Sequence, residues 1–273
     1  MRTKERRKKE KVHRNVAKGT SRKEMIVRCA LVGIALVLFV IFFAVDYDGA
    51  KAALEKNFTA ASGEVLLSGL INTFLITLVA FAMGLSIGTF VCLITQSAGQ
   101  SLLVLVCKQI ANFYVLLFRG TPVVVQLLVI YFIVFASFNG GSLYVAMLVF
   151  GLNSGAYVSE IIRGGIGAVS LGQREAGLSL GLSYRSVMGK IVLPQAYKNA
   201  FPSLCNEVIA LLKETSVAGF IATLDLTQAF RKIADRTYDY VTVYLVMGVF
   251  YFTIVMVLSA LLNLLERKAF RHA

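Results

Sequence analysis

Residues Gly164 to Pro202 read GGIGAVSLGQREAGLSLGLSYRSVMGKIVLPQAYKNAFP, a polar and charged stretch set between long apolar runs. We expect two short helices in it, Gln173–Leu180 and Tyr184–Val192. They are separated at Gly181, where a residue without a Cβ permits a sharp turn. The sequence Ile-Val-Leu-Pro at 191–194 is expected to close the second helix. The stretch therefore predicts a helical hairpin held outside a lipid bilayer.

The composition of this hairpin favours a docking role. Small side chains at Ala176 and Gly177 would let another protein approach closely, and the Glu175 carboxylate suits a helix start. The hairpin also carries more apolar residues than a freely solvated loop tolerates. They are Leu178, Leu180, Leu182, Val187, Met188 and Ile191. An amphipathic connector lying on the membrane surface is the alternative. A long loop with its own secondary structure is usually functional, which favours docking.

The composition of the whole chain identifies an integral membrane protein. Hydrophobic residues make up 57% of the chain, charged residues 16%, and the mean hydropathy is +0.73. The net charge of +13 is concentrated at the start, where residues 1–28 hold twelve Lys and Arg against three Glu. A basic tail before a span is typical of a cytoplasmic N-terminus and of contact with anionic lipid. No groove-reading or aromatic motif accompanies the charge, so we expect no nucleic-acid partner.

The chain is predicted to be all-α, with six transmembrane helices. Basic residues at both termini and in the hairpin place all three in the cytoplasm, which requires an even number of crossings. Leu102–Leu117, interrupted by Lys108, is then expected to be interfacial or partly inserted. The expected spans are Ile26–Val45, Val65–Thr95, Gly120–Phe138, Ser142–Ile162, Pro202–Ala222 and Tyr240–Leu265.

Polar residues inside these spans suggest a path through the membrane, because charged groups at mid-membrane normally face the bundle interior or water. Candidates for a substrate path are Asn153, Tyr157, Asn206, Lys213 and Thr215. An interhelical network without substrate contact is equally consistent with Asn206 and Lys213. For Glu160 we favour an ion pair, because Arg163 follows three residues later on the same helical face.

Several chemistries are excluded or disfavoured by the residues. Gly189-Lys190-Ile191 lacks the Ser or Thr and the upstream glycine of a phosphate-binding loop. Both histidines lie in the terminal tails, and the four cysteines are scattered without paired spacing, so neither a metal site nor a disulfide is expected. We expect a transport protein and not an enzyme, without a cofactor of its own.

The motifs resemble those of the polar amino-acid ABC-importer permeases of the histidine/glutamine type. Residues 172–177 (Gly-Gln-Arg-Glu-Ala-Gly) and 191–196 (Ile-Val-Leu-Pro-Gln-Ala) are similar to the cytoplasmic coupling loop, the EAA motif, of that family. Further matching segments keep the family's order over about residues 64–265. They are Gly69–Thr73, Arg119–Pro122 with Gln126, Gly155–Gly164, Gly181 and Leu212–Ser216. The third position of the motif is Gly177 instead of alanine, which lowers helix propensity by about 1 kcal/mol.

The resemblance implies a five-helix permease core, preceded here by one extra span. The expected layout is a basic cytoplasmic tail (1–25), the extra span (26–45), an extracytoplasmic loop (46–64), the permease core (65–265) with its coupling loop (164–201), and a cytoplasmic tail (266–273). The residues implied in ATPase coupling are Gln173, Glu175, Ala176, Gly177, Gly181, Ile191, Leu193 and Pro194.

The implied function is ATP-driven import of polar amino acids across the cell membrane of a prokaryote. The implied partners are a cytoplasmic ABC ATPase dimer that binds the ATP, a second permease subunit, which makes a homodimer or a heterodimer, an extracytoplasmic amino-acid-binding protein and membrane lipid. A secondary, ion-coupled transporter is the alternative, since it would also place charged residues mid-membrane. A membrane-anchored scaffold would explain the basic tail but not Glu207 and Lys213.

Overall fold

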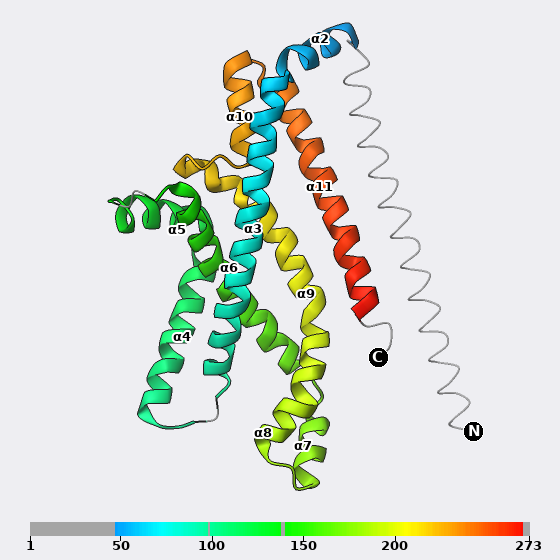
Figure 1. Cartoon of the computed structure of the whole chain (residues 1–273). Helices are drawn as coiled ribbons and strands as arrows, with labels where there is room; N and C mark the ends of the chain where they lie inside the picture. Colours follow the sequence, from blue (N-terminus) through cyan, green and yellow to red (C-terminus); the bar gives the residue numbers. More distant parts are fainter. Residues whose placement is uncertain (1–46, 98, 138–139, 270–273) are drawn as a thin grey trace, which may run out of the picture. The chain divides into compact units, whose positions relative to one another are not determined.

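A computed structural model of the chain describes residues 47–97, 99–137 and 140–269 (Figure 1). The chain divides into two units at Lys56. The described part of the first unit is helix α2 (Tyr47–Asn57) up to Lys56, and it carries a solvent-exposed Lys51–Glu55 ion pair of 4.0 Å. The predicted basic tail and the predicted span Ile26–Val45 lie outside the described residues. Within the predicted extracytoplasmic segment 46–64, most of the described residues are helical.

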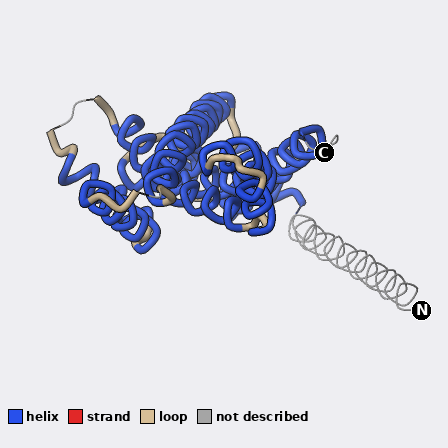
Figure 2. The backbone as a smooth tube through the Cα atoms, turned by 90° about the horizontal axis from the view of Figure 1, so that it is seen from below, coloured by secondary structure: helices blue, strands red, loops and turns tan. Residues whose placement is uncertain are grey.

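The second unit contains the remaining helices, joined by short connections (Figure 2). No strand occurs among the described residues. The α-helices are α3 (Ala60–Thr95), α4 (Leu102–Gly120), α5 (Val123–Val129), α6 (Ser142–Gly167), α7 (Leu171–Ser179), α8 (Tyr184–Val187), α9 (Leu193–Glu214), α10 (Leu226–Thr237) and α11 (Tyr240–Ala269). Two π-helical turns, η1 (Ile130–Val134) and η2 (Met188–Val192), and one 3-10 helix, η3 (Thr215–Ile221), complete the set.

The centre of the second unit is the close packing of α3 on α6. A Cβ added to Gly84 would lie 2.7 Å from Ser154 Oγ, and one added to Gly88 would lie 2.7 Å from Val158. Both glycines are therefore needed for the helices to approach so closely. Phe150 and Ile76 are fully buried in the adjacent apolar core.

Four helices of the described residues are long and apolar enough to cross a membrane: α3, α4, α6 and α11. The second predicted span, Val65–Thr95, lies within α3, but the third, Gly120–Phe138, and the interfacial placement of Leu102–Leu117 were wrong. Leu102–Gly120 is a continuous helix of 19 residues, whereas the predicted span Gly120–Phe138 contains only the short apolar stretch Val123–Val134. The break falls at Thr121, which is extended, as the residue before Pro122 usually is. Exchanging one span for the other leaves the expected even number of crossings unchanged.

The helix after the hairpin begins earlier than predicted. The second hairpin helix does not close at Pro194; through η2 it continues directly into α9, which also passes Pro202. Pro194 is the second residue of α9 and comes directly after the π-helical turn η2. Pro202 removes one backbone hydrogen bond inside the helix. Close packing compensates, since Ala200 of α9 lies against Gly165 of α6.

At the end opposite the hairpin, α10 lies beside the first turns of α3 and the start of α11 (Figure 1). Asn57 donates to Asp239 Oδ2 at 2.7 Å, and Arg236 donates to the Ser62 hydroxyl at 2.5 Å. Asn57 is fully buried, although it begins the glycosylation sequon Asn57-Phe58-Thr59. The sequon is therefore not presented for modification in the folded protein.

Candidate functional site

The hairpin of residues 171–192 has the geometry expected for it. Helix α7 ends in a left-handed turn at Gly181, with φ of +78°. The Gly181 N–H donates to Leu178 O at 2.9 Å and the Leu182 N–H donates to Gly177 O at 3.2 Å. This paired hydrogen-bond pattern is the Schellman motif, in which glycine is favoured. Ser183 then caps α8 by accepting from the Ser186 N–H at 3.3 Å. The prediction of two helices separated at Gly181 is confirmed.

Gly177 lies inside the hairpin and not on its surface. It is buried, and an added Cβ would lie 2.9 Å from Val187 Cγ2 and 3.0 Å from Ile191 Cδ1. Its small size therefore lets α7 pack on α8 and η2, and does not serve the approach of another protein. Ile191, also predicted for coupling, contributes to this internal contact.

The outer face of α7 is open. Gln173, Glu175 and Ala176 are all exposed, as are several large apolar side chains on the same hairpin. The apolar ones are Leu171, Leu178, Leu180, Leu182, Tyr184 and Leu193. An exposed carboxylate and a small side chain surrounded by apolar groups form a surface suited to protein docking. Pro194 is exposed as well, at the start of α9.

Arg174, which the sequence reading left without a role, ties the hairpin to the bundle. Its guanidinium donates to Ile166 O at 3.3 Å, near the end of α6. A cation at a helix C-terminus is stabilised by the free carbonyls there. Asn199 of α9 points at the neighbouring carbonyl of Gly165, at 3.5 Å. The first arm of the hairpin and the helix that follows its second arm, α9, therefore both contact the last turn of α6.

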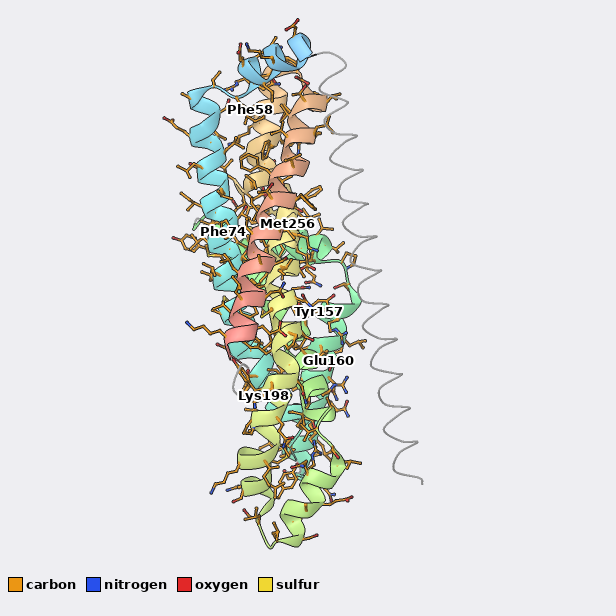
Figure 3. The ribbon with its side chains drawn as sticks, turned by 90° about the vertical axis from the view of Figure 1, so that its right-hand side faces the viewer. Phe58, Phe74, Tyr157, Glu160, Lys198 and Met256 are labelled. Carbon is orange, nitrogen blue, oxygen red and sulfur yellow. The ribbon has the colours of Figure 1, made fainter. Side chains whose placement is uncertain are left out.

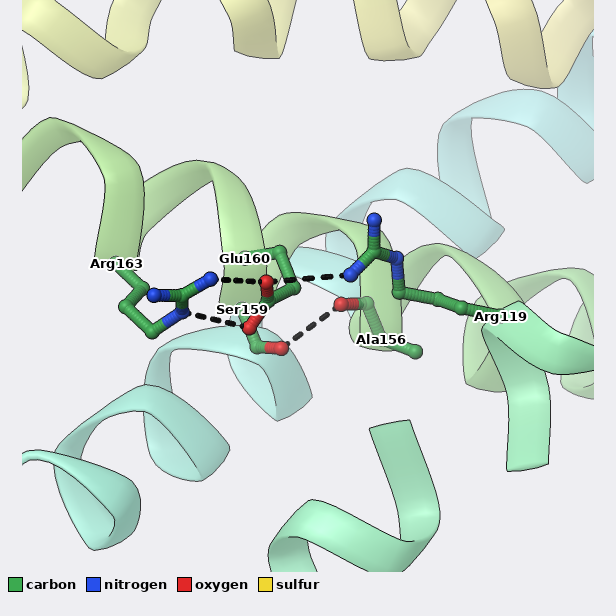
Figure 4. A network of polar contacts seen from close by, with 5 residues as sticks. All are labelled: Arg119, Ala156, Ser159, Glu160 and Arg163. Atoms are coloured by element: carbon green, nitrogen blue, oxygen red, sulfur yellow. Dashed lines mark hydrogen bonds and ion pairs between the residues drawn. The ribbon is translucent and has the colours of Figure 1, made fainter. Parts of the chain in front are cut away.

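An ionic cluster lies on α6 between the core and the hairpin, on the stretch where Figure 3 labels Tyr157 and Glu160. Arg163 donates to both oxygens of Glu160, at 2.8 and 2.6 Å, as predicted from their spacing. Arg119, at the end of α4, pairs with the same carboxylate at 3.2 Å (Figure 4). Its guanidinium carbon also lies over the Tyr157 ring, 5.4 Å from the ring centroid. The second arginine was not predicted, because 41 residues separate it from Glu160.

Asn153, a predicted path residue, is engaged in a buried network at the break between α4 and α5. Its amide donates to Phe118 O at 3.2 Å and to Gln126 Oε1 at 3.1 Å. Gln126 in turn donates to Phe118 O, to Thr121 O and to Thr121 Oγ1. The network satisfies carbonyls that the break at Pro122 leaves free. Asn153 therefore has a structural role at this break, and that role involves no contact with a substrate.

The other predicted path residues lie on or just after α9. Asn206 and Lys213 are exposed on the isolated chain. Thr215 is fully buried and donates to Leu212 O at 2.7 Å, which stabilises the start of η3. Glu207 accepts a hydrogen bond from Ser154 of α6 at 2.8 Å. The structure thus separates two accessible polar residues from one that is internal.

Enzyme-like sites are not supported by the described residues. Gly84–Gly88 and Gly177–Gly181 both read Gly-x-Ser-x-Gly, the spacing of a hydrolase nucleophile turn. That turn links a strand to a helix, whereas the first stretch lies inside α3 and the second runs from α7 into its terminal turn. Within the part of the chain that the structure covers, no three His, Cys, Asp or Glu side chains cluster as metal ligands would.

Comparison with known protein families agrees with this picture of a docking hairpin on a bundle of membrane-spanning helices. Residues 106–271 match the family described as the binding-protein-dependent transport system inner membrane component. The chain belongs to this family. The matched segment contains the hairpin, the ionic cluster and α9. A member of this family is a transport component, with ATP hydrolysis in separate subunits.

Curated relatives of this inner membrane component are amino-acid permeases. The chain is 36% identical over 219 residues to the arginine transport system permease protein ArtQ of Bacillus subtilis (strain 168), covering 79% of this chain and 98% of that protein. It is 35% identical to the putative glutamine transport system permease protein GlnP of Rickettsia felis, covering 74% and 92%. It is 33% identical to the L-cystine permease TcyB of B. subtilis, covering 76% and 88%.

Solved structures support the same fold. A crystal structure of an amino acid ABC transporter with histidines matches with a TM-score of 0.70 and 38% identity, covering 76% of this chain and 94% of that one. The MetNI methionine ABC transporter matches with a TM-score of 0.64 at 19% identity, which supports the fold alone. The predicted fold class, an all-α membrane permease, is confirmed. The count of six spans stays a prediction.

Proposed function

We propose that this inner membrane component is the permease subunit of an ATP-driven importer of polar amino acids. The observation that carries the proposal is the α7 surface: exposed, partly apolar and held on a hairpin beyond the spans. The named relatives transport arginine, glutamine and cystine, which supports an amino-acid substrate.

The proposed partners follow from the surfaces. An ABC ATPase dimer would bind the exposed face of α7 through Gln173, Glu175 and Ala176 and would hold the ATP, so that this chain needs no cofactor. A second permease subunit, identical or related, would complete the path. A binding protein would deliver the amino acid at the opposite end. This arrangement puts the hairpin and both termini in the cytoplasm, in accordance with the basic residues near them.

The proposed mechanism is alternating access driven by the ATPases. Closure of the ATPase dimer would move α7, and the Arg174 contact with Ile166 O would carry that movement to α6. Because α6 packs tightly on α3 and is paired with Arg119 of α4, its displacement would be shared by the bundle. Rigid helices that shift together are a common route for such transitions.

Among the predicted path residues, Asn206 and Lys213 are the ones we place in contact with substrate, because both are exposed on α9. Tyr157, half-buried beside Arg119, is a further candidate. Asn153 and Thr215 would support the path from inside the bundle, since their side chains already bond to the chain itself.

The test is a mild-detergent pull-down of the tagged chain from its own host, with Glu175→Arg beside the wild type. We expect the variant to lose at least about ten-fold of the co-purified ATPase, since a reversed charge at a docking centre commonly costs more than 1.4 kcal/mol. Lys198→Glu is the matched control: it also reverses an exposed charge near the hairpin, but on α9 (Figure 3).

The control should retain the ATPase, and both variants should reach the membrane at wild-type levels. Equal recovery of the ATPase with Glu175→Arg and with wild type would remove Glu175 from the docking surface. Absence of any ATPase from the wild-type sample would favour an ion-coupled transporter instead.

A further inference from the structure

Helix α10 has two opposite faces. Its apolar face is buried against α3 and α11, and consists of Leu226, Ala229, Phe230, Ile233 and Ala234. Its other face carries Arg231, Lys232 and Asp235, all exposed, one turn above the half-buried Gln228. The recurrence of both sets at intervals of three and four residues makes α10 a strongly amphipathic helix.

Contacts with α3 fix the position of this charged face along the axis of α3. The Leu226 N–H donates to Thr73 Oγ1 at 3.0 Å, and Arg236 donates to Ser62. Between these points, a Cβ on Gly69 would lie 2.8 Å from Ala229. Helices α3 and α10 therefore run antiparallel. Along the axis of α3, Lys232 lies at the level of Leu66 and Leu67.

The same level of α3 has an apolar outer surface. Leu67 and Ile71 are 58% and 56% exposed, and the exposed apolar stripe continues along this span to Leu75 and Leu78. In a membrane such a stripe faces lipid. Charged side chains at that level avoid the hydrocarbon by facing a watery cavity or by reaching the headgroups. At this level the protein therefore has an apolar surface on α3 that faces lipid and a charged surface on α10.

The charged side has an excess of positive charge. Arg231 pairs with Asp235 only loosely, at 3.8 Å between two exposed side chains. Lys232 has no ion-pair partner among the described residues. Gln228 lies against Gly219 of η3, and η3 leads back to Lys213 at the end of α9. The inner end of the polar face of α10 therefore packs against the segment that follows α9.

We infer that the face of α10 formed by Gln228, Arg231, Lys232 and Asp235 lines a water-filled outer vestibule and attracts the carboxylate of an incoming amino acid. The inference rests on the proposed function for its orientation and for its substrate class. It gives the permease an anion-attracting wall at the end away from the coupling hairpin, where the substrate would arrive (Figure 1).

The lining is tested by thiol accessibility in intact cells. Single cysteines replace Lys232 and, as the level-matched control, Leu67, in a background in which Cys29, Cys92, Cys107 and Cys205 are alanine. The probe is a membrane-impermeant, sulfonate-bearing methanethiosulfonate. We expect it to modify Lys232→Cys at least ten-fold faster than Leu67→Cys.

Two results would contradict the proposal that this face of α10 lines a water-filled vestibule. Equal rates for the two cysteines would show that this level lies outside the bilayer, so that exposure of α10 implies no cavity. An unmodified Lys232→Cys would show a face covered by lipid or protein. Denatured samples of both variants should react fully, which confirms that each thiol is present and intact.

The attraction is tested separately with Gln228→Cys, which keeps both basic residues. The ratio of its rates with the sulfonate reagent and with a trimethylammonium reagent is normalised to a small free thiol. Adding Arg231→Gln and Lys232→Gln should lower that ratio about three- to five-fold at 0.1 M salt, since two nearby charges act on opposite reagents in opposite directions. An unchanged ratio would refute the attraction.

These measurements do not depend on transport or on the ATPase. The same labelling pattern is expected in cells that lack the ATPase partner. If it holds while no ATPase binds the chain, the vestibule stands and the importer proposal falls. If the ATPase binds but Lys232→Cys is unreactive, the importer stands and the vestibule falls.

Discussion

Replacing Gly177 by alanine is expected to loosen the coupling hairpin, although alanine is the better helix former. The helix propensity gained is about 1 kcal/mol. The new methyl would lie 2.9 Å from Val187 Cγ2 and 3.0 Å from Ile191 Cδ1. Val187 is 1% exposed and stiff, so it yields little, and overpacking of this kind costs about 1–3 kcal/mol. The balance is a net loss of about 0–2 kcal/mol.

The second variant, Val187→Ala, makes this reasoning testable. Alone it removes two buried methyl groups and should cost about 2 kcal/mol. Combined with Gly177→Ala, it removes the close contact while the added methyl fills part of the space. The double variant should therefore lose about 1–2 kcal/mol less than the sum of the single losses.

The assay is amide hydrogen exchange of residues 171–192 in detergent or nanodiscs, read as local opening free energies. Amides of α10 serve as an internal reference, since that helix lies in a separate core cluster at the end opposite the hairpin (Figure 1). Strict additivity of the two changes would refute the packing account of Gly177. A stabilised Gly177→Ala would show instead that propensity outweighs the contact with Val187.

Three further outcomes follow from the polar contacts. Glu160→Gln should destabilise the protein by about 0.5–1 kcal/mol, because Arg119 and Arg163 lose a charged partner while all three side chains stay partly exposed; heat-resistance of the solubilised protein measures this, and an unchanged profile contradicts it. Asn153→Leu, which removes a buried network residue, should cost about 1–3 kcal/mol while leaving the KM for uptake unchanged; a selective rise in KM would instead place Asn153 in contact with substrate. In a host that glycosylates proteins, Asn57 should carry no glycan, so the intact mass of the protein should equal that of the bare chain. A glycan at Asn57 would show that its hydrogen bond to Asp239 breaks and exposes the side chain.

Local chemistry explains why the hairpin was predictable from sequence. Gly181 needs a positive φ, Ser183 is a typical cap, and a short polar stretch between apolar runs leaves few alternatives. The pairing of Glu160 with Arg163 was equally local, since three residues separate them on one helix face. The packing role of Gly177 could not be predicted in this way, because Val187 and Ile191 become its neighbours only when α7 folds back on α8 and η2.

The errors in the spans have a common cause. The sequence predicts spans that begin at or near Pro122 and Pro202, and the even number of crossings then places Leu102–Leu117 at the interface. The structure breaks the chain at Pro122 but carries α9 through Pro202, where packing of Ala200 on Gly165 compensates. Tertiary contacts decide between these outcomes for the same residue type. Sequence periodicity does not contain that information.

The arrangement of the contacts indicates which helix would move first when a partner binds. Arg174 at the start of the hairpin contacts the Ile166 carbonyl, and Gly165 lies so close to α9 that an added Cβ would be 2.6 Å from Ala196 O. The last turn of α6 therefore contacts the hairpin through Arg174 and packs on α9, the helix that follows the hairpin. A displacement of α7 would reach α6 directly through Arg174, and then α4 through the Arg119–Glu160 pair. We expect α6 to be the helix that passes the movement of a docked partner to the rest of the bundle.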